Sequence, residues 1–273
     1  MATAAPVYAD RTVSLGRVFQ RAFNAITLNP VVILGLALVV GALPGLIMSY
    51  VFVQLGLVAS PQAVHVGPSG LPAISPGRII GTSLISSLTV MIIGALVQGA
   101  LTRAVVTANE GRKATFGESL STGFRVILPL IGFSILFAIA IAIGFVLLIV
   151  PGVILLLMWA VAVPSLVIEN TGVMGAFGRS SELTRGAKGK IFGLFLVLAV
   201  AYWILSIVLG LFGLSMYGVN NSAAGLSVGN LVGSVLLGTI FHVLWGAVQP
   251  SLYVELRQWK EGSSAENLAE VFA

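Results

Sequence analysis

The sequence predicts an all-α membrane protein with six transmembrane helices, and two observations carry this prediction. Of the 273 residues, 58% are apolar and only 8% are charged, whereas roughly a quarter of a soluble domain is charged. The charges are also segregated, because long stretches contain no Asp, Glu, Lys or Arg. These stretches lie between Arg21 and Arg78, between Arg78 and Arg103, between Arg125 and Glu169, and between Lys190 and Glu255. Each is at least as long as the ~20 residues with which a helix crosses the hydrocarbon.

The first charge-free stretch predicts one span, from Val31 to about Leu57, followed by a loop rich in proline and glycine that ends near Gly77. Pro44 and Gly45 lie in the middle of this span. Because proline removes a helical hydrogen bond and crowds the preceding turn, we expect a kink there. A second span is expected from Ile79 to about Thr102.

The stretch between Arg125 and Glu169 is about twice as long as one crossing, and Val150, Pro151 and Gly152 lie near its middle. This pattern predicts spans three and four, joined as a tight hairpin. The last stretch predicts span five, from Ile191 to about Tyr217, and span six, from about Asn230 to Val254. A polar loop at residues 220–222 separates them.

The orientation follows from the basic residues, because short cytoplasmic loops retain Lys and Arg. Six spans place every Lys and Arg except Arg78, together with every acidic residue, on one side. That side is predicted to be the cytoplasm, and both termini lie there. The net charge of +5 is therefore a topology signal, and no nucleic-acid partner is expected.

The ends of spans four and six have the same sequence pattern. Trp, Pro, Ser, Leu and Glu coincide without a gap when Trp159–Glu169 is aligned with Trp245–Glu255. The end of span two, Val97–Leu101, matches Val248–Leu252 more weakly, with Gly99 in the position of the proline. This self-similarity predicts an internal repeat.

A short segment of mixed polarity precedes each pair of spans: Ser14–Ile26, Thr115–Ile127 and Val173–Gly186. In the first, apolar and polar residues occupy opposite helical faces, which is typical of a helix lying in the membrane interface. An ordinary cytoplasmic helix packed on the loops is the alternative. We expect one membrane domain, 1–273, built from three parallel repeats of an interfacial helix plus a transmembrane pair and related by a pseudo-threefold axis. The expected repeats are about 13–108, 114–169 and 173–256, with a cytoplasmic tail at 257–273.

Polar side chains at bilayer depth are costly and mark the first candidate positions for function. Three such side chains are candidate functional residues: Gln98, His242 and Gln249. They can hydrogen-bond across helix contacts, or they can line a substrate path. No second histidine or acid stands in the spans to complete a metal site, the chain has no cysteine, and no cofactor is expected.

A second candidate is a charge cluster at the cytoplasmic interface, formed by Glu169, Arg179, Glu182 and Arg185. Its basic members could bind anionic headgroups, and its acids could serve a lipid enzyme. The alternative is a solvated loop with an ion pair such as Glu169 with Arg179.

The hairpin at Val150–Gly152 and the downstream run resemble the YciC-like bacterial membrane proteins. They are equally similar to the membrane domain that accompanies some glycerophosphodiester phosphodiesterases. The shared pattern covers roughly residues 145–195. Its downstream run comprises Ala176, Arg179, Ser180, Leu183, Thr184 and Gly186. The resemblance implies a bacterial inner membrane and an envelope-related role. It implies no catalytic residue, because the phosphodiesterase chemistry of those proteins belongs to a separate soluble domain.

These observations favour a non-catalytic inner-membrane scaffold or lipid-interacting subunit of a membrane assembly. Its expected partners are membrane lipids and other membrane-protein subunits. A transporter or channel for a small neutral or lipidic molecule is the alternative. An interfacial lipid enzyme built on Glu169, Arg179 and Glu182 is the third hypothesis.

Overall fold

The computed structural model describes residues 13–54, 76–217 and 228–262, and within these ranges it contains helices and no strand. The expected loop residues 220–222, most of the loop after span one and the end of the tail lie outside the described residues. The helices, in chain order, are α1 Leu15–Leu28, α2 Pro30–Gly35, the π-helix η1 Leu36–Ala42, α3 Leu43–Gln54, α4 Pro76–Asn109, α5 Phe116–Leu147, α6 Ile149–Met158, α7 Ala162–Glu169, α8 Gly172–Thr184, α9 Lys188–Tyr217 and α10 Val228–Glu261.

Six helices or helix combinations are long and apolar enough to cross a membrane, which confirms the all-α polytopic prediction. They are Pro30–Phe52, Ile80–Asn109, Phe116–Leu147, Ile149–Glu169, Lys188–Leu211 and Val232–Glu261. Many of their large apolar side chains are exposed, for example Val90 and Trp203. Such faces fit lipid as the surrounding medium, because water would make their exposure unfavourable.

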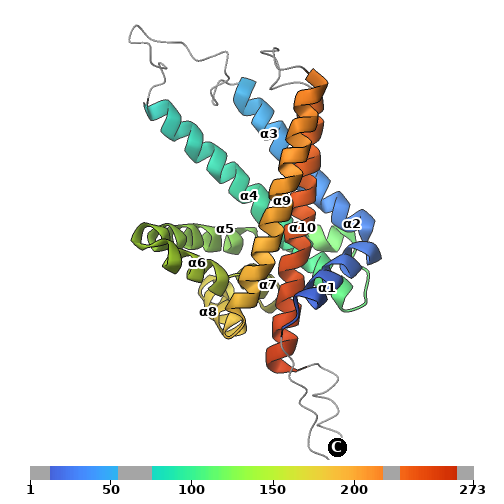
Figure 1. Cartoon of the computed structure of the whole chain (residues 1–273), viewed down its shortest axis with the longest axis vertical. Helices are drawn as coiled ribbons and strands as arrows, with labels where there is room; N and C mark the ends of the chain where they lie inside the picture. Colours follow the sequence, from blue (N-terminus) through green and yellow to red (C-terminus); the bar gives the residue numbers. More distant parts are fainter. Residues whose placement is uncertain (1–12, 55–75, 218–227, 263–273) are drawn as a thin grey trace, which may run out of the picture.

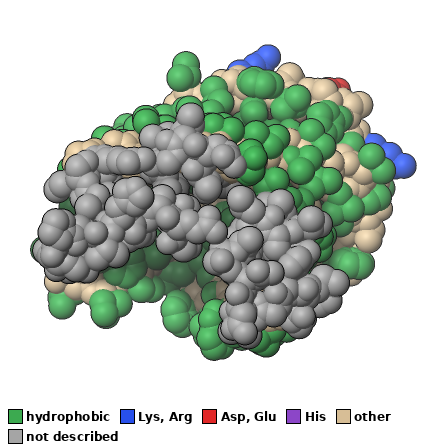
Figure 2. Space-filling view, turned by 90° about the horizontal axis from the view of Figure 1, so that it is seen from above, with side chains coloured by type: hydrophobic (Ala, Val, Ile, Leu, Met, Phe, Trp, Pro, Cys, Tyr) green, Lys and Arg blue, Asp and Glu red, His purple; other side chains and the backbone are tan. Residues whose placement is uncertain are grey.

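The helix pairs leave a common region in different directions (Figure 1). α1, α7, α8 and the C-terminal ends of α4 and α10 gather there. In Figure 1, α3, α4, α9 and α10 extend upward from this region, whereas α5 and α6 extend to the left. Seen from above, hydrophobic side chains dominate the described surface, and the few charged ones appear at the rim (Figure 2). A common threefold axis for the pairs stays a prediction.

Span one bends by widening into a π-helix. In η1 the N–H of Leu43 donates to the carbonyl of Leu38, five residues back. Pro44 follows at once; it lacks an N–H, and its ring would collide with a carbonyl four residues back in a regular α-helix. The wider turn relieves this conflict. The disruption was therefore expected at the correct place, but as a kink rather than as a π-helical segment.

The hairpin of spans three and four turns earlier than predicted. Leu148 alone separates α5 from α6, with extended backbone angles of φ −168° and ψ 152°. Pro151 and Gly152 belong to the first turn of α6. Proline is tolerated there because the first N–H groups of a helix lack intrahelical partners. A Cβ on Gly144 would lie 3.0 Å from the Cα of Gly152, so the two glycines allow the close return.

The short segments before the spans behave differently from one another. Ser14–Ile26 and Val173–Gly186 correspond to the separate helices α1 and α8, whereas Thr115–Ile127 is continuous with span three in α5. The expectation of a separate interfacial helix there was wrong. Thr115 and Glu118 form a reciprocal capping box that starts α5, and Pro129 does not interrupt it.

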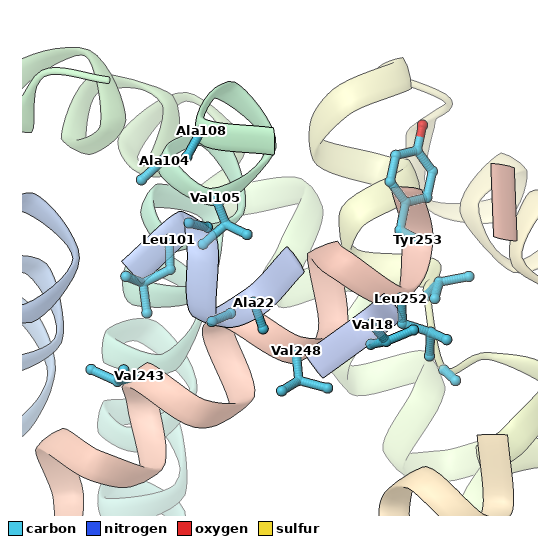
Figure 3. Packing of buried hydrophobic residues seen from close by; sticks show 14 of the residues in the cluster. Val18, Ala22, Leu101, Ala104, Val105, Ala108, Val243, Val248, Leu252 and Tyr253 are labelled. Atoms are coloured by element: carbon cyan, nitrogen blue, oxygen red, sulfur yellow. The ribbon is translucent and has the colours of Figure 1, made fainter. Parts of the chain in front are cut away.

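The largest apolar cluster lies where α1, α4 and α10 meet (Figure 3). Val18 of α1 and Leu252 of α10 are fully buried and lie side by side, and Val105 of α4 belongs to the same cluster. α1 is therefore not only an amphipathic surface helix. Its buried face packs on α10, while Phe23 remains exposed.

Candidate functional site

Two of the three polar residues selected in the spans form a single hydrogen-bonded group. The Gln98 side-chain amide of α4 donates to Oε1 of Gln249 in α10. Nε2 of Gln249 donates in turn to the carbonyl oxygen of Ala160, at 2.8 Å. Amides placed in this way satisfy each other and the backbone at a depth where no water competes.

The carbonyl of Ala160 needs a partner because span four is broken between α6 and α7. α6 ends at Met158, and the span restarts with α7 at Ala162. Pro164 thereby lies in the first turn of α7, where its missing N–H costs no hydrogen bond. The break leaves backbone groups without helical partners in the hydrocarbon, where each such group is costly.

α8 supplies the remaining partners of the break. Oγ of Ser180 donates to the carbonyl oxygen of Met158 at 2.9 Å and accepts from the N–H of Val161 at 3.2 Å. Oγ1 of Thr184 also donates to Met158, at 3.0 Å. The Ser–Thr pair of the downstream run therefore belongs to the assembly of the broken span.

His242, the third selected residue, packs against η1. A Cβ on Gly41 would lie 2.6 Å from Cδ2 of His242, so the imidazole occupies the space that the glycine leaves open. His242 does not join Gln98 and Gln249 in a hydrogen bond. The structure therefore brings two of the three selected residues together and places the third in a separate helix contact.

The predicted interfacial cluster is centred on Glu169. Nε of Arg179 lies 3.0 Å and 2.8 Å from its two carboxylate oxygens, and the hydroxyl of Tyr253 donates to Oε1 at 2.7 Å. The hydrogen bond with Glu169 raises the pKa of the Arg179 guanidinium above its ordinary value, so this guanidinium stays positively charged. Arg179 also pairs with Glu261 of α10.

The other two members of that cluster contribute little. Glu182 lies 3.9 Å from Arg179 and is largely exposed. Arg185 is exposed and forms no ion pair with any residue that the structure describes. Tyr253, which is not among the candidate residues predicted from the sequence, is a hydrogen-bond donor of the site.

A second carboxylate, Glu255, has the same role at another helix crossing. Its side chain is only 3% exposed. It accepts from the N–H of Ser14 at 3.3 Å, from Nε and Nη2 of Arg17 at 2.7 Å, and it pairs with Nε of Arg21 at 3.4 Å. Sequence reasoning missed this contact, although the alignment of Glu255 with Glu169 was a signal that could have revealed it.

The same buried spacing recurs in α1, α8 and the first turns of α5. Each segment buries residues at positions i, i+4 and i+7, and these are small side chains for the most part. They are Val18, Ala22 and Ala25 in α1, Ser119, Gly123 and Val126 in α5, and Ala176, Ser180 and Leu183 in α8. Gly123 lies against the carbonyl of Leu96, and Ser180 bonds Val161, which occupies the position aligned with Leu96.

The described helices line an apolar groove and a polar pocket. An apolar groove of about 230 Å³ lies between α9 and α10 and is lined by aromatic residues such as Tyr202 and Trp245. A polar pocket of about 330 Å³ lies between α4, α5 and the end of α7, with Arg103 and Arg125 among its lining residues. Gln98, His242 and Gln249 line neither of them. Among the described residues, no three His, Asp or Glu side chains come together as metal ligands.

Comparison with protein-family models, curated proteins and solved structures found no match for the chain.

Proposed function

We propose that this polytopic membrane protein is a non-catalytic scaffold or lipid-interacting subunit of a membrane assembly. The observation that carries the proposal is the hydrogen-bonded group of Gln98, Gln249 and the Ala160 carbonyl. Polar atoms that are paired within helix contacts contribute to assembly and are not exposed to a passing substrate. The packing of His242 against Gly41 supports the same role.

The proposal includes three parallel repeats. Its support is the equivalent contact at two crossings: Glu169, at the end of span four, binds α8, while Glu255, in the last two turns of α10, binds α1. The common buried spacing of α1, α5 and α8 adds to this support. In this arrangement each short helix packs on the second span of the preceding repeat. α8 packs on span four, and α1 packs on span six, which closes the ring of three repeats.

A bacterial inner membrane with both termini in the cytoplasm completes the proposal, in line with the resemblance to the YciC-like proteins. The chain contains no cysteine, so single cysteines can be introduced directly. In intact cells, a membrane-impermeant maleimide is expected to label Ser69→Cys and to spare Lys113→Cys. In inside-out vesicles the two results exchange. Labelling of Lys113→Cys from outside the cell would invert the proposed topology.

Transport is the second candidate, and the break between α6 and α7 is the observation that favours it. Discontinuous transmembrane helices often form the substrate sites of transporters. Here, however, Ser180, Thr184 and Gln249 already bond the groups that the break frees. A transporter would have to exchange these bonds for a substrate or for water.

Cysteine accessibility distinguishes the two functions. Gln98→Cys, Gln249→Cys and His242→Cys are expected to resist a small hydrophilic thiol reagent in vesicles, because packed positions exclude water. Lys113→Cys, at an exposed position between α4 and α5, is the reactive control in inside-out vesicles. Fast labelling of Gln98→Cys and Gln249→Cys under native conditions, with unchanged thermal stability, would contradict the proposal and support a water-filled path.

A further inference from the structure

The polar pocket between α4, α5 and the end of α7 lies at the helix crossing where the repeat alignment lacks an ion pair. By the repeat alignment, Ala104 of α4 takes the position of Glu169 and Glu255. Thr122 of α5 takes the position of Arg21, because Ser14 aligns with Thr115. At this third crossing two short side chains therefore replace a carboxylate and a guanidinium. Thr122 lines the pocket of about 330 Å³, whereas Ala104 is fully buried in the apolar cluster.

Two cations that line the pocket form no ion pair with the described residues. Arg103 of α4 and Arg125 of α5 form no ion pair and no hydrogen bond with the residues that the structure describes, although Arg17, Arg21 and Arg179 all bind carboxylates. Charged groups near a low-dielectric region gain most from a partner of opposite charge. Two guanidinium groups that line one pocket without an ion pair therefore favour the binding of an anion there.

The only acid lining this pocket, Glu118, is already engaged. Its Oε2 accepts from the N–H of Thr115 at 3.1 Å and from the Thr115 hydroxyl at 2.9 Å. Arg103 acts on Glu118 through its charge, without an ion pair within bonding distance. Because Glu118 cancels one positive charge at most, the pocket keeps an excess of positive charge.

We propose that this pocket binds the phosphate diester of a membrane glycerophospholipid, and that Arg103 and Arg125 contact its phosphate oxygens. Guanidinium groups match phosphate oxygens with paired, charge-assisted hydrogen bonds. The hydroxyls of Ser121 and Thr122 donate to the Glu118 carbonyl, and their lone pairs can accept from a headgroup. This inference rests on the proposed lipid-interacting function and names the site and the ligand class.

A lipid, rather than a soluble phosphate, fits the apolar surface beside the arginines. Phe124 precedes Arg125, and Leu128 lies one turn further along α5 in the direction of the hairpin; their side chains are 57% and 76% exposed. Val167 and Ile168 contribute apolar lining from α7. A bound lipid would place its acyl chains on Phe124 and Leu128 while its phosphate occupies the pocket.

Native mass spectrometry of the detergent-purified full chain tests the proposal. The probes are dioleoylphosphatidylglycerol, its phosphate-free analogue dioleoylglycerol and the soluble headgroup glycerophosphoglycerol. The Arg103→Gln/Arg125→Gln variant is compared with Lys188→Gln/Lys190→Gln, which removes the same charge elsewhere on this end. We expect the arginine variant to bind the phospholipid at least about tenfold more weakly, since a hydrogen bond to a charged group contributes about 1.5–3 kcal/mol. The lysine variant should change affinity less than about twofold.

A second measurement localises the ligand. Phosphatidylglycerol, and not dioleoylglycerol, should slow maleimide labelling of Ser121→Cys in the pocket. Equal weakening by the arginine and lysine variants would reduce the effect to nonspecific charge attraction and overturn the site. Protection by glycerophosphoglycerol as strong as by the lipid would instead assign the pocket to a soluble phosphate ester.

Failure of the pocket proposal can be distinguished from failure of the proposed function. If the arginine variant binds lipid as the parent does while Gln98→Cys stays unlabelled, the pocket proposal is wrong and the proposed function stands. If Gln98→Cys labels rapidly, the proposed function fails whatever the pocket binds. The charge-retaining Arg103→Lys/Arg125→Lys variant guards against misfolding, because it should keep the melting temperature and partly restore lipid affinity.

Discussion

The ion pairs between α1 and Glu255 predict that replacing the arginines destabilises the contact more than replacing the carboxylate. The carboxylate is 3% exposed, whereas Arg17 is 49% and Arg21 24% exposed. If both arginines become methionine, Glu255 keeps a single backbone donor, Ser14 N–H, and remains a buried charge. If Glu255 becomes glutamine, the partly exposed side chains of Arg17 and Arg21 can turn to water or to lipid phosphate. The cost therefore depends on which partner is left behind.

The expected magnitudes follow from these exposures. Arg17→Met/Arg21→Met should weaken the attachment of α1 by about 3–5 kcal/mol, as is usual when a buried charge loses its partner. Glu255→Gln should cost only about 1–2 kcal/mol, because the carboxamide still accepts hydrogen bonds and replaces charge-assisted bonds with neutral ones. The triple variant should be more stable than the arginine double variant, since it removes the unpaired charge.

The assay uses a buried cysteine as a reporter of α1 detachment. Val18 is fully buried, beside Leu252 of α10, so Val18→Cys reacts only when α1 opens (Figure 3). Each 1.4 kcal/mol is a tenfold change in the open population. Labelling should therefore accelerate about 10²-fold to 4 × 10³-fold in the arginine variant and about 5- to 30-fold in Glu255→Gln. Faster opening in Glu255→Gln than in the arginine variant would refute the argument from burial.

Three further predictions concern the spans, and thermal melting in detergent measures each of them. Gly41→Ala should destabilise the protein by about 1–3 kcal/mol, because its Cβ would lie 2.6 Å from Cδ2 of His242, and combining it with His242→Ala should recover most of the loss; equal losses in the single and combined variants would contradict this contact. Gln249→Leu should cost about 1–3 kcal/mol by leaving the Ala160 carbonyl and the Gln98 amide unpaired, and an unchanged melting temperature would show that water already reaches them. Thr102→Val should be neutral or stabilise the protein by about 1 kcal/mol, because the buried Thr102 hydroxyl has no partner; clear destabilisation would mean that it has one.

The spans could be predicted from the sequence because the hydrocarbon excludes ionised side chains over a fixed thickness. The charge-free stretches placed all six spans, with ends that differ from the structural ends by a few residues. Local signals were less decisive. Pro44 and Pro151 marked disruptions correctly, but a proline is compatible with a kink, a π-helix or a new first turn. Which of these forms depends on space and on partners that come from elsewhere in the fold.

The broken span four shows why the rest could not be predicted. A break at Trp159–Val161 is stable only because Ser180 and Thr184 of α8 and Gln249 of α10 satisfy its backbone. None of these partners is close in sequence, and hydropathy gives no signal of a hydrogen bond between helices. The ion pair of Glu169 with Arg179 was foreseen, since both belong to one loop region. The ion pair of Glu255 with Arg17 joins residues near the two ends of the chain, and it was not foreseen.

Glu169 and Glu255, which occupy equivalent positions in the proposed repeats, also explain where free positive charge can remain. Both lie near the C-terminal end of a span and pair with arginines of a short helix, so Arg17, Arg21 and Arg179 are committed to assembly. The crossing of α4 and α5 is held differently, by the close approach of Gly123 to Leu96, and needs no ion pair. Its arginines are therefore free of a structural task. In a chain whose solvent is the bilayer, Arg103 and Arg125 are thus available to the lipid phosphates of the proposed site, with Glu118 as the one acid in the described lining of the pocket.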